Sequence, residues 1–76
     1  MNCLIIESIA GISFQFDELL EEGEIVFKQK QSRMKWHYPI SKTNYIQLNP
    51  FLIYGEKAEI DVISKGKLLV RKTIRF

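Results

Sequence analysis

The sequence predicts an all-β domain, a small antiparallel β-sandwich of six to seven short strands. Apolar residues recur with a period of two along most of the chain, which is typical of half-buried strands. Eleven residues are isoleucine, and β-branched residues favour strands. Turn signals separate the apolar stretches at intervals of about ten residues, a spacing that indicates a sandwich or a small barrel.

Residues 4–6 form an apolar run, typical of a strand that is buried on both faces. Residues 12–16 alternate apolar and polar side chains, typical of a strand with one face in the core. Ala10 and Gly11 mark a turn between the two segments. We therefore expect the two strands to pair as a hairpin.

The next segment, DELLEEG, interrupts the alternation. Asp17 suits the start of a helix and Gly23 suits its end, although the segment has room for only about one turn. Either one helical turn or a connecting loop is expected, with Leu19 and Leu20 covering the core and the acidic side chains in solvent.

A third strand is expected over residues 24–28, and a polar connection follows it. In the stretch RMKWHYPI, residues 33–40, cationic side chains alternate with large apolar ones. Since successive side chains of a strand point to opposite faces, the pattern predicts one core stripe and one outward face. Pro39 cannot donate a ladder hydrogen bond, so this strand is expected to end there or to lie at a sheet edge.

The remaining segments also follow strand and turn patterns. SKTN, residues 41–44, predicts a loop before a short strand at 45–48. Residues 58–62 and 68–76 alternate on either side of a turn at Ser64–Lys67, and they predict a closing hairpin. Its apolar stripe is interrupted at Lys72. Cross-strand pairs are expected between two acids and two cations, namely Glu59, Asp61, Arg71 and Arg75.

The residues Leu48, Pro50 and Tyr54, followed by a final hairpin, resemble the tyrosine corner of fibronectin type III and related immunoglobulin-like domains. The resemblance covers one corner and the last thirty or so residues. It implies a sandwich in which the Tyr54 hydroxyl bonds to upstream backbone, and a binding or spacer role. The alternative architecture is a small SH3-like or OB-like barrel.

The chain is expected to form one β-rich domain, residues 1–76, with a thin core. One cysteine, Cys3, excludes an internal disulfide, and the amino-terminal stretch lacks the basic and apolar regions of a signal peptide. No apolar run has the ~20 residues that span a bilayer. These features predict no membrane association, no secretion through a signal peptide, and a location in the cytoplasm or in an assembled particle such as a virion.

No catalytic, cofactor-binding or metal-binding site is predicted. His37 and Cys3 are the single members of their types, so the chain alone cannot supply the four ligands of a structural zinc site. Cys3 begins an apolar strand, where a thiol is usually inert. The acids between residues 17 and 24 lack the spacing of a calcium loop, and the four glycines are isolated, unlike those of a phosphate loop. The chain is therefore expected not to be an enzyme.

Charge is distributed unevenly: acids cluster at residues 17–24, while residues 25–44 and 65–76 carry cations and no acid. This distribution predicts a candidate contact face formed by Lys28, Lys30, Arg33, Lys35, His37, Arg71 and Arg75.

The function predicted from these features is a protein–protein interaction or structural module, which contacts a partner or its own copies through sheet edges. The abundance of isoleucine and lysine is typical of phage products, so an assembly or injection-machine component is favoured. The alternatives are a small inhibitor that docks on a host defence complex, and a small barrel that binds single-stranded nucleic acid.

Overall fold

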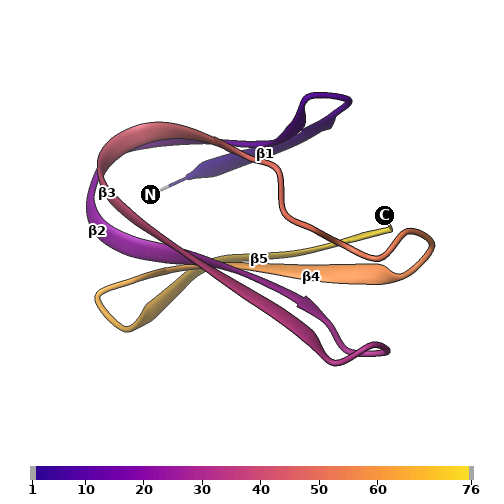
Figure 1. The fold of residues 1–76 in the computed structure, drawn as a ribbon. Coiled ribbons are helices and arrows are strands. Elements are labelled where there is room, and N and C mark those ends of the chain that lie inside the picture. The colour runs from indigo at the N-terminus through magenta and orange to yellow at the C-terminus, as the bar shows by residue number, and fades with distance from the viewer. Residues whose placement is uncertain (1, 76) are drawn as a thin grey trace.

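The computed structural model describes residues 2–75 as one antiparallel sheet (Figure 1). The predicted all-β antiparallel class is confirmed, and no helix occurs within the described part of the chain. The sheet has five strands, where six to seven were expected: β1 (Cys3–Ser8), β2 (Gly11–Gln29), β3 (Met34–Leu48), β4 (Lys57–Ser64) and β5 (Lys67–Arg75).

The long strand β2 organises the sheet. One edge of β2 pairs with β3 along almost its full length. The other edge pairs first with β1, over Gly11–Phe16, and then with β4, over residues 24–28. Strand β5 pairs with β4 alone. Because β2 and β3 bend together, the sheet curls, and its β1 part lies over its β4–β5 part (Figure 1).

The curl encloses a single core, to which both parts of the sheet contribute buried side chains. Phe14 lies on the first part of β2 and Phe27 on the second, and their ring centroids are 6.0 Å apart in an edge-to-face arrangement. Phe27 also contacts Tyr38 of β3, with a centroid distance of 5.7 Å. These aromatic contacts hold the two parts of the curled sheet together.

The DELLEEG segment is part of β2, so the expectation of a helical turn or loop is wrong. Four residues, 16–19, stand opposite a single residue of β3, which forms the irregularity at which the strand bends. Leu20 is buried at this bend, whereas Leu19 is exposed. Gly23 does not end a helix. It allows β4 to approach, because a Cβ at this position would lie 2.5 Å from the Ile63 carbonyl oxygen.

The predicted loop at residues 41–44 also lies within a strand, β3. Lys42 has a φ of 49°, in the left-handed region, and lies on β3 next to the bend formed opposite residues 16–19 of β2. Two pairs of predicted short strands are therefore one long strand each, which accounts for the lower strand count.

Strand β1 differs from its prediction in burial. Ile5 is buried, but Leu4 and Ile6 are exposed on the outer surface of the sheet. Only one face of β1 therefore contacts the core.

The closing hairpin is confirmed. Lys65 and Gly66 form its two-residue turn with φ values of 52° and 73°, the left-handed conformation that suits a tight hairpin. Ile74 is buried in the core, whereas Lys72, opposite buried Ile60, is exposed. The predicted end of the apolar stripe, Phe76, lies outside the described residues.

The connection between β3 and β4, residues 49–56, is anchored by buried Gln29 at the end of β2. Its side chain donates to the Ile53 carbonyl oxygen at 2.8 Å and accepts from the Ile53 amide at 2.7 Å. Leu52 adds a buried apolar contact. Tyr54 is 87% exposed, so its ring is not packed into the core, and the predicted bond of its hydroxyl to upstream backbone stays a prediction.

Candidate binding face

The outer surface of β3, β2, β4 and β5 carries most of the predicted contact residues. Lys35 lies opposite Lys28, which lies opposite Glu59 on the next strand, so the three share one face. The neighbouring row contains His37, Val26, Asp61 and Arg71 in strand order. We call this surface the charged face, and its members are Glu24, Val26, Lys28, Lys35, His37, Lys57, Glu59, Asp61, Arg71, Thr73 and Arg75.

Five of the seven predicted contact residues belong to the charged face. The other two, Lys30 and Arg33, lie in the turn between β2 and β3, where the Arg33 amide donates to the Lys30 carbonyl oxygen at 3.3 Å. The predicted division of residues 33–40 is confirmed on the strand. Ile40 is buried, and Trp36 and Tyr38 pack against the core, while Lys35 and His37 are exposed.

Asp61 is the centre of an ion-pair network on the charged face. It is only 1% exposed and accepts hydrogen bonds from Lys28 Nζ at 3.0 Å and from Arg71 Nε at 2.8 Å and Nη2 at 3.2 Å. Glu59 adds two longer contacts, with Lys28 Nζ at 3.7 Å and with Arg71 Nε at 3.6 Å. The predicted pairing of Arg71 with these acids is confirmed, and two of the predicted cations are engaged within the protein.

The Arg71 guanidinium lowers the pKa of the Asp61 carboxyl, and Lys28 acts in the same direction against the opposing effect of burial. A lowered pKa in the folded state stabilises the fold at a pH above the unfolded value of about 3.9. This contribution is lost as the pH falls below about 5 and through the folded pKa.

Acidification is therefore expected to narrow the stability difference between the wild type and Asp61→Asn. At pH 7 the substitution removes a charged acceptor from Arg71 and Lys28, and we expect a loss of about 1–3 kcal/mol in the free energy of unfolding. At pH 2–3, below the unfolded value of about 3.9, much of this contribution is lost, and the difference between the two proteins is expected to narrow. Urea unfolding at both pH values measures the difference, and an equal difference at both would contradict the role of Asp61.

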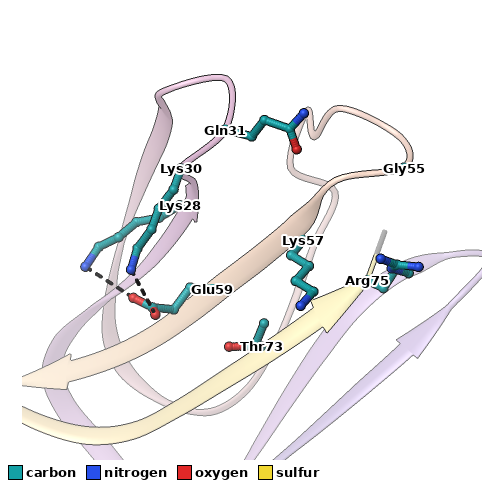
Figure 2. Close-up of a pocket in the computed structure, with 8 residues that line it drawn as sticks. All are labelled: Lys28, Lys30, Gln31, Gly55, Lys57, Glu59, Thr73 and Arg75. Carbon is teal, nitrogen blue, oxygen red and sulfur yellow. Dashed lines mark ion pairs between the residues drawn. The ribbon is translucent and has the colours of Figure 1, made fainter.

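A hollow of about 420 Å³ lies at the end of the charged face, between the β2–β3 turn and the β3–β4 connection. Figure 2 shows the side chains of Lys28 and Lys30 directed to Glu59. The Lys30 Nζ lies 3.9 Å from Glu59. The full lining is Lys28, Lys30, Gln31, Gly55, Lys57, Glu59, Thr73 and Arg75, four cations with one acid.

Two cations of the hollow lie directly opposite each other. Lys57 of β4 faces Arg75 of β5, and among residues 2–75 neither has a carboxylate within 4.0 Å. Like charges at directly opposite positions destabilise a sheet.

Arg75 was predicted to face an acid, which is wrong: Glu59 lies opposite Thr73. Sequence reasoning missed Lys57, and only the register of the hairpin reveals its position beside Arg75.

Cys3 and His37 are the two side chains that sequence reasoning weighed for catalysis or metal binding. Burial raises the pKa of the Cys3 thiol, which favours its unreactive protonated form. His37 lies near Glu24, with Nδ1 3.4 Å from the carboxylate. Within residues 2–75, no three potential ligand side chains form a metal-binding cluster, and no helix of the described chain has the length and apolarity needed to cross a membrane.

Comparison with protein-family models, with curated proteins and with solved structures finds no match to this chain.

Proposed function

We propose that the chain is a non-enzymatic interaction module that holds an acidic segment of a partner protein in the hollow of the charged face. The proposal rests on the opposed pair Lys57 and Arg75, which costs the sheet stability and has no carboxylate neighbour among the described residues. A carboxylate placed between the two cations would relieve their repulsion and bind by charge-assisted hydrogen bonds.

The rest of the charged face supports a folded or extended protein partner. Glu59 and Glu24 lie among the cations, so the surface carries both signs of charge and can select the orientation of a partner. The exposed aromatic residues Phe51 and Tyr54 belong to the connection that lines the hollow through Gly55, and aromatic side chains are enriched in protein interfaces.

Within this class, we favour a structural or assembly component of a phage-type particle, located in that particle or in the cytoplasm. An inhibitor that docks on a host defence complex is the alternative, because it would use the same kind of charged surface. The resemblance of residues 48–54 to fibronectin type III domains points to a similar binding role. The immunoglobulin-like sandwich and the alternative small barrel stay predictions.

A second candidate function is binding of single-stranded nucleic acid, favoured by the cationic hollow and by the exposed rings of Phe51 and Tyr54 in the connection that lines it through Gly55. The acids within the charged face would repel a phosphate backbone, and Trp36 and Tyr38 pack against the core, where bases cannot stack on them. These two observations place nucleic acid second.

Replacing both Lys57 and Arg75 by serine is expected to weaken binding of a fluorescent oligoglutamate peptide by about tenfold, equivalent to about 1.4 kcal/mol. The matched control is Lys42→Ser with Lys65→Ser, which removes the same charge at exposed positions that do not line the hollow. Fluorescence anisotropy at low salt measures both. Equal affinity of the two double variants would contradict the site, and tighter binding of a single-stranded oligonucleotide than of the peptide would favour the second candidate.

A further inference from the structure

The curled sheet is open between β1 and β5, and we call this opening the seam. Strand β1 pairs only with β2, and β5 pairs only with β4. The two strands are linked instead by a side chain: Lys72 Nζ donates to the Ile5 carbonyl oxygen at 3.3 Å. This contact explains the cation that interrupts the apolar stripe of β5, since its chain reaches across the seam.

The pairing of β1 with β2 determines which backbone amides and carbonyls of β1 point into the seam. The Asp17 amide donates to the Asn2 carbonyl oxygen at 3.1 Å, so Asn2 is bonded to β2. Bonded and non-bonded positions alternate along an antiparallel pair. The amides and carbonyls of Cys3, Ile5 and Glu7 therefore point away from β2 and into the seam, and the bond from Lys72 to Ile5 agrees with this assignment.

The Lys72 contact limits the width of the seam. Neighbouring strands lie ~4.8 Å apart, so a strand inserted between two others needs about twice that distance. A lysine side chain reaches at most ~6 Å, and with the hydrogen bond of 3.3 Å this sets an upper limit of about the same size. An inserted backbone would therefore have to displace the Lys72 side chain.

We propose that the seam accepts an extended peptide segment of a partner protein, which pairs with β1 and carries an acidic residue facing Lys72. The inserted backbone would take over the Ile5 carbonyl oxygen and satisfy the other edge groups of β1. The displaced ammonium group of Lys72, on the inward side of β5, would then pair with the carboxylate. Exposed Leu4 and Ile6 would gain apolar cross-strand neighbours on the outer surface.

The partner segment must not already belong to a β-sheet of the partner. A strand inserted between β1 and β5 needs both of its own edges free of other strands. A second copy of this chain does not meet this requirement through β1, one edge of which is already paired with β2. This docking site is separate from the hollow: Lys57 and Arg75 lie on the outward side of the sheet, whereas Lys72 lies at an inward position.

Selection of a random peptide library, displayed on phage, against the full chain tests the proposal. We expect enriched peptides to alternate apolar residues and to carry Asp or Glu at one fixed position. Selection against Lys72→Glu is expected to place Lys or Arg at that position. The absence of enriched peptides, or an identical preference with both proteins, would overturn the proposal.

A proline variant locates the docking site on the backbone. The Glu7 amide points into the seam, so Glu7→Pro removes a donor and places a ring at the edge while the ladder to β2 is retained. We expect the selected peptide to bind Glu7→Pro at least tenfold more weakly than the matched control Glu7→Ala. Unchanged binding of the peptide to Glu7→Pro would overturn a site in the seam. Loss of binding in the double serine variant of Lys57 and Arg75 would also overturn it.

Discussion

Replacing Phe27 by alanine is expected to lower the free energy of unfolding by about 3–5 kcal/mol. Phe27 is fully buried and lies edge-to-face with both Phe14 and Tyr38. Its removal leaves a cavity where the two parts of the curled sheet meet. Small domains have little stability in reserve, so a large fraction of the variant is expected to be unfolded at 37 °C.

Urea unfolding followed by circular dichroism measures this loss, and Phe27→Leu keeps the experiment quantitative if the alanine variant does not fold. Leu68→Ala is the matched control, because Leu68 is exposed near the β4–β5 turn and its truncation is expected to cost less than about 1 kcal/mol. Similar losses for Phe27→Ala and Leu68→Ala would contradict a core centred on Phe27.

Replacing Gln29 by leucine is expected to cost about 2–4 kcal/mol and to release the β3–β4 connection. Leucine retains much of the buried volume but removes both hydrogen bonds to Ile53. The Ile53 amide then loses its partner in a partly buried setting, where an unsatisfied group costs ~1–3 kcal/mol. The Ile53 carbonyl oxygen keeps only the longer hydrogen bond from the Glu56 amide, at 3.4 Å. The expected signature is faster hydrogen exchange of the Ile53 amide.

The control for Gln29 is Gln47→Leu. The Gln47 side chain also donates to a backbone carbonyl, that of Ala10 at 2.6 Å, but this contact is exposed to solvent. Its loss is expected to change the free energy of unfolding by less than about 1 kcal/mol, because water replaces the partner. A large effect at Gln47, or unchanged exchange at Ile53 in Gln29→Leu, would show that the buried hydrogen bonds do not hold the connection.

Alternation predicted the faces of a strand well where the strand is regular and one face meets the core. The strand over residues 34–40 illustrates this: Trp36, Tyr38 and Ile40 contact the core, whereas Lys35 and His37 are exposed, because register and burial agree. The same reasoning failed for DELLEEG, since local cap and turn signals resemble those of a helix, and tertiary pairing with β3 overrides them.

Part of the charged face was also predicted from the alternation of side chains along the strands. Parity placed Lys28, Lys35 and His37 on one side of their strands. Parity does not say which residues of distant strands become neighbours. The opposition of Lys57 and Arg75, the burial of Asp61 and the reach of Lys72 to Ile5 depend on the register and the curl of the whole sheet.

The continuity of β2 through both parts of the sheet also determines how the protein unfolds. Three of the four strand pairings include β2, and the fourth, between β4 and β5, is attached to it through β4. A cut within residues 16–19 would leave neither fragment with a complete core. We therefore expect residues 2–75 to unfold as one cooperative unit, and contacts between residues that are distant in sequence to form in the slow step of folding.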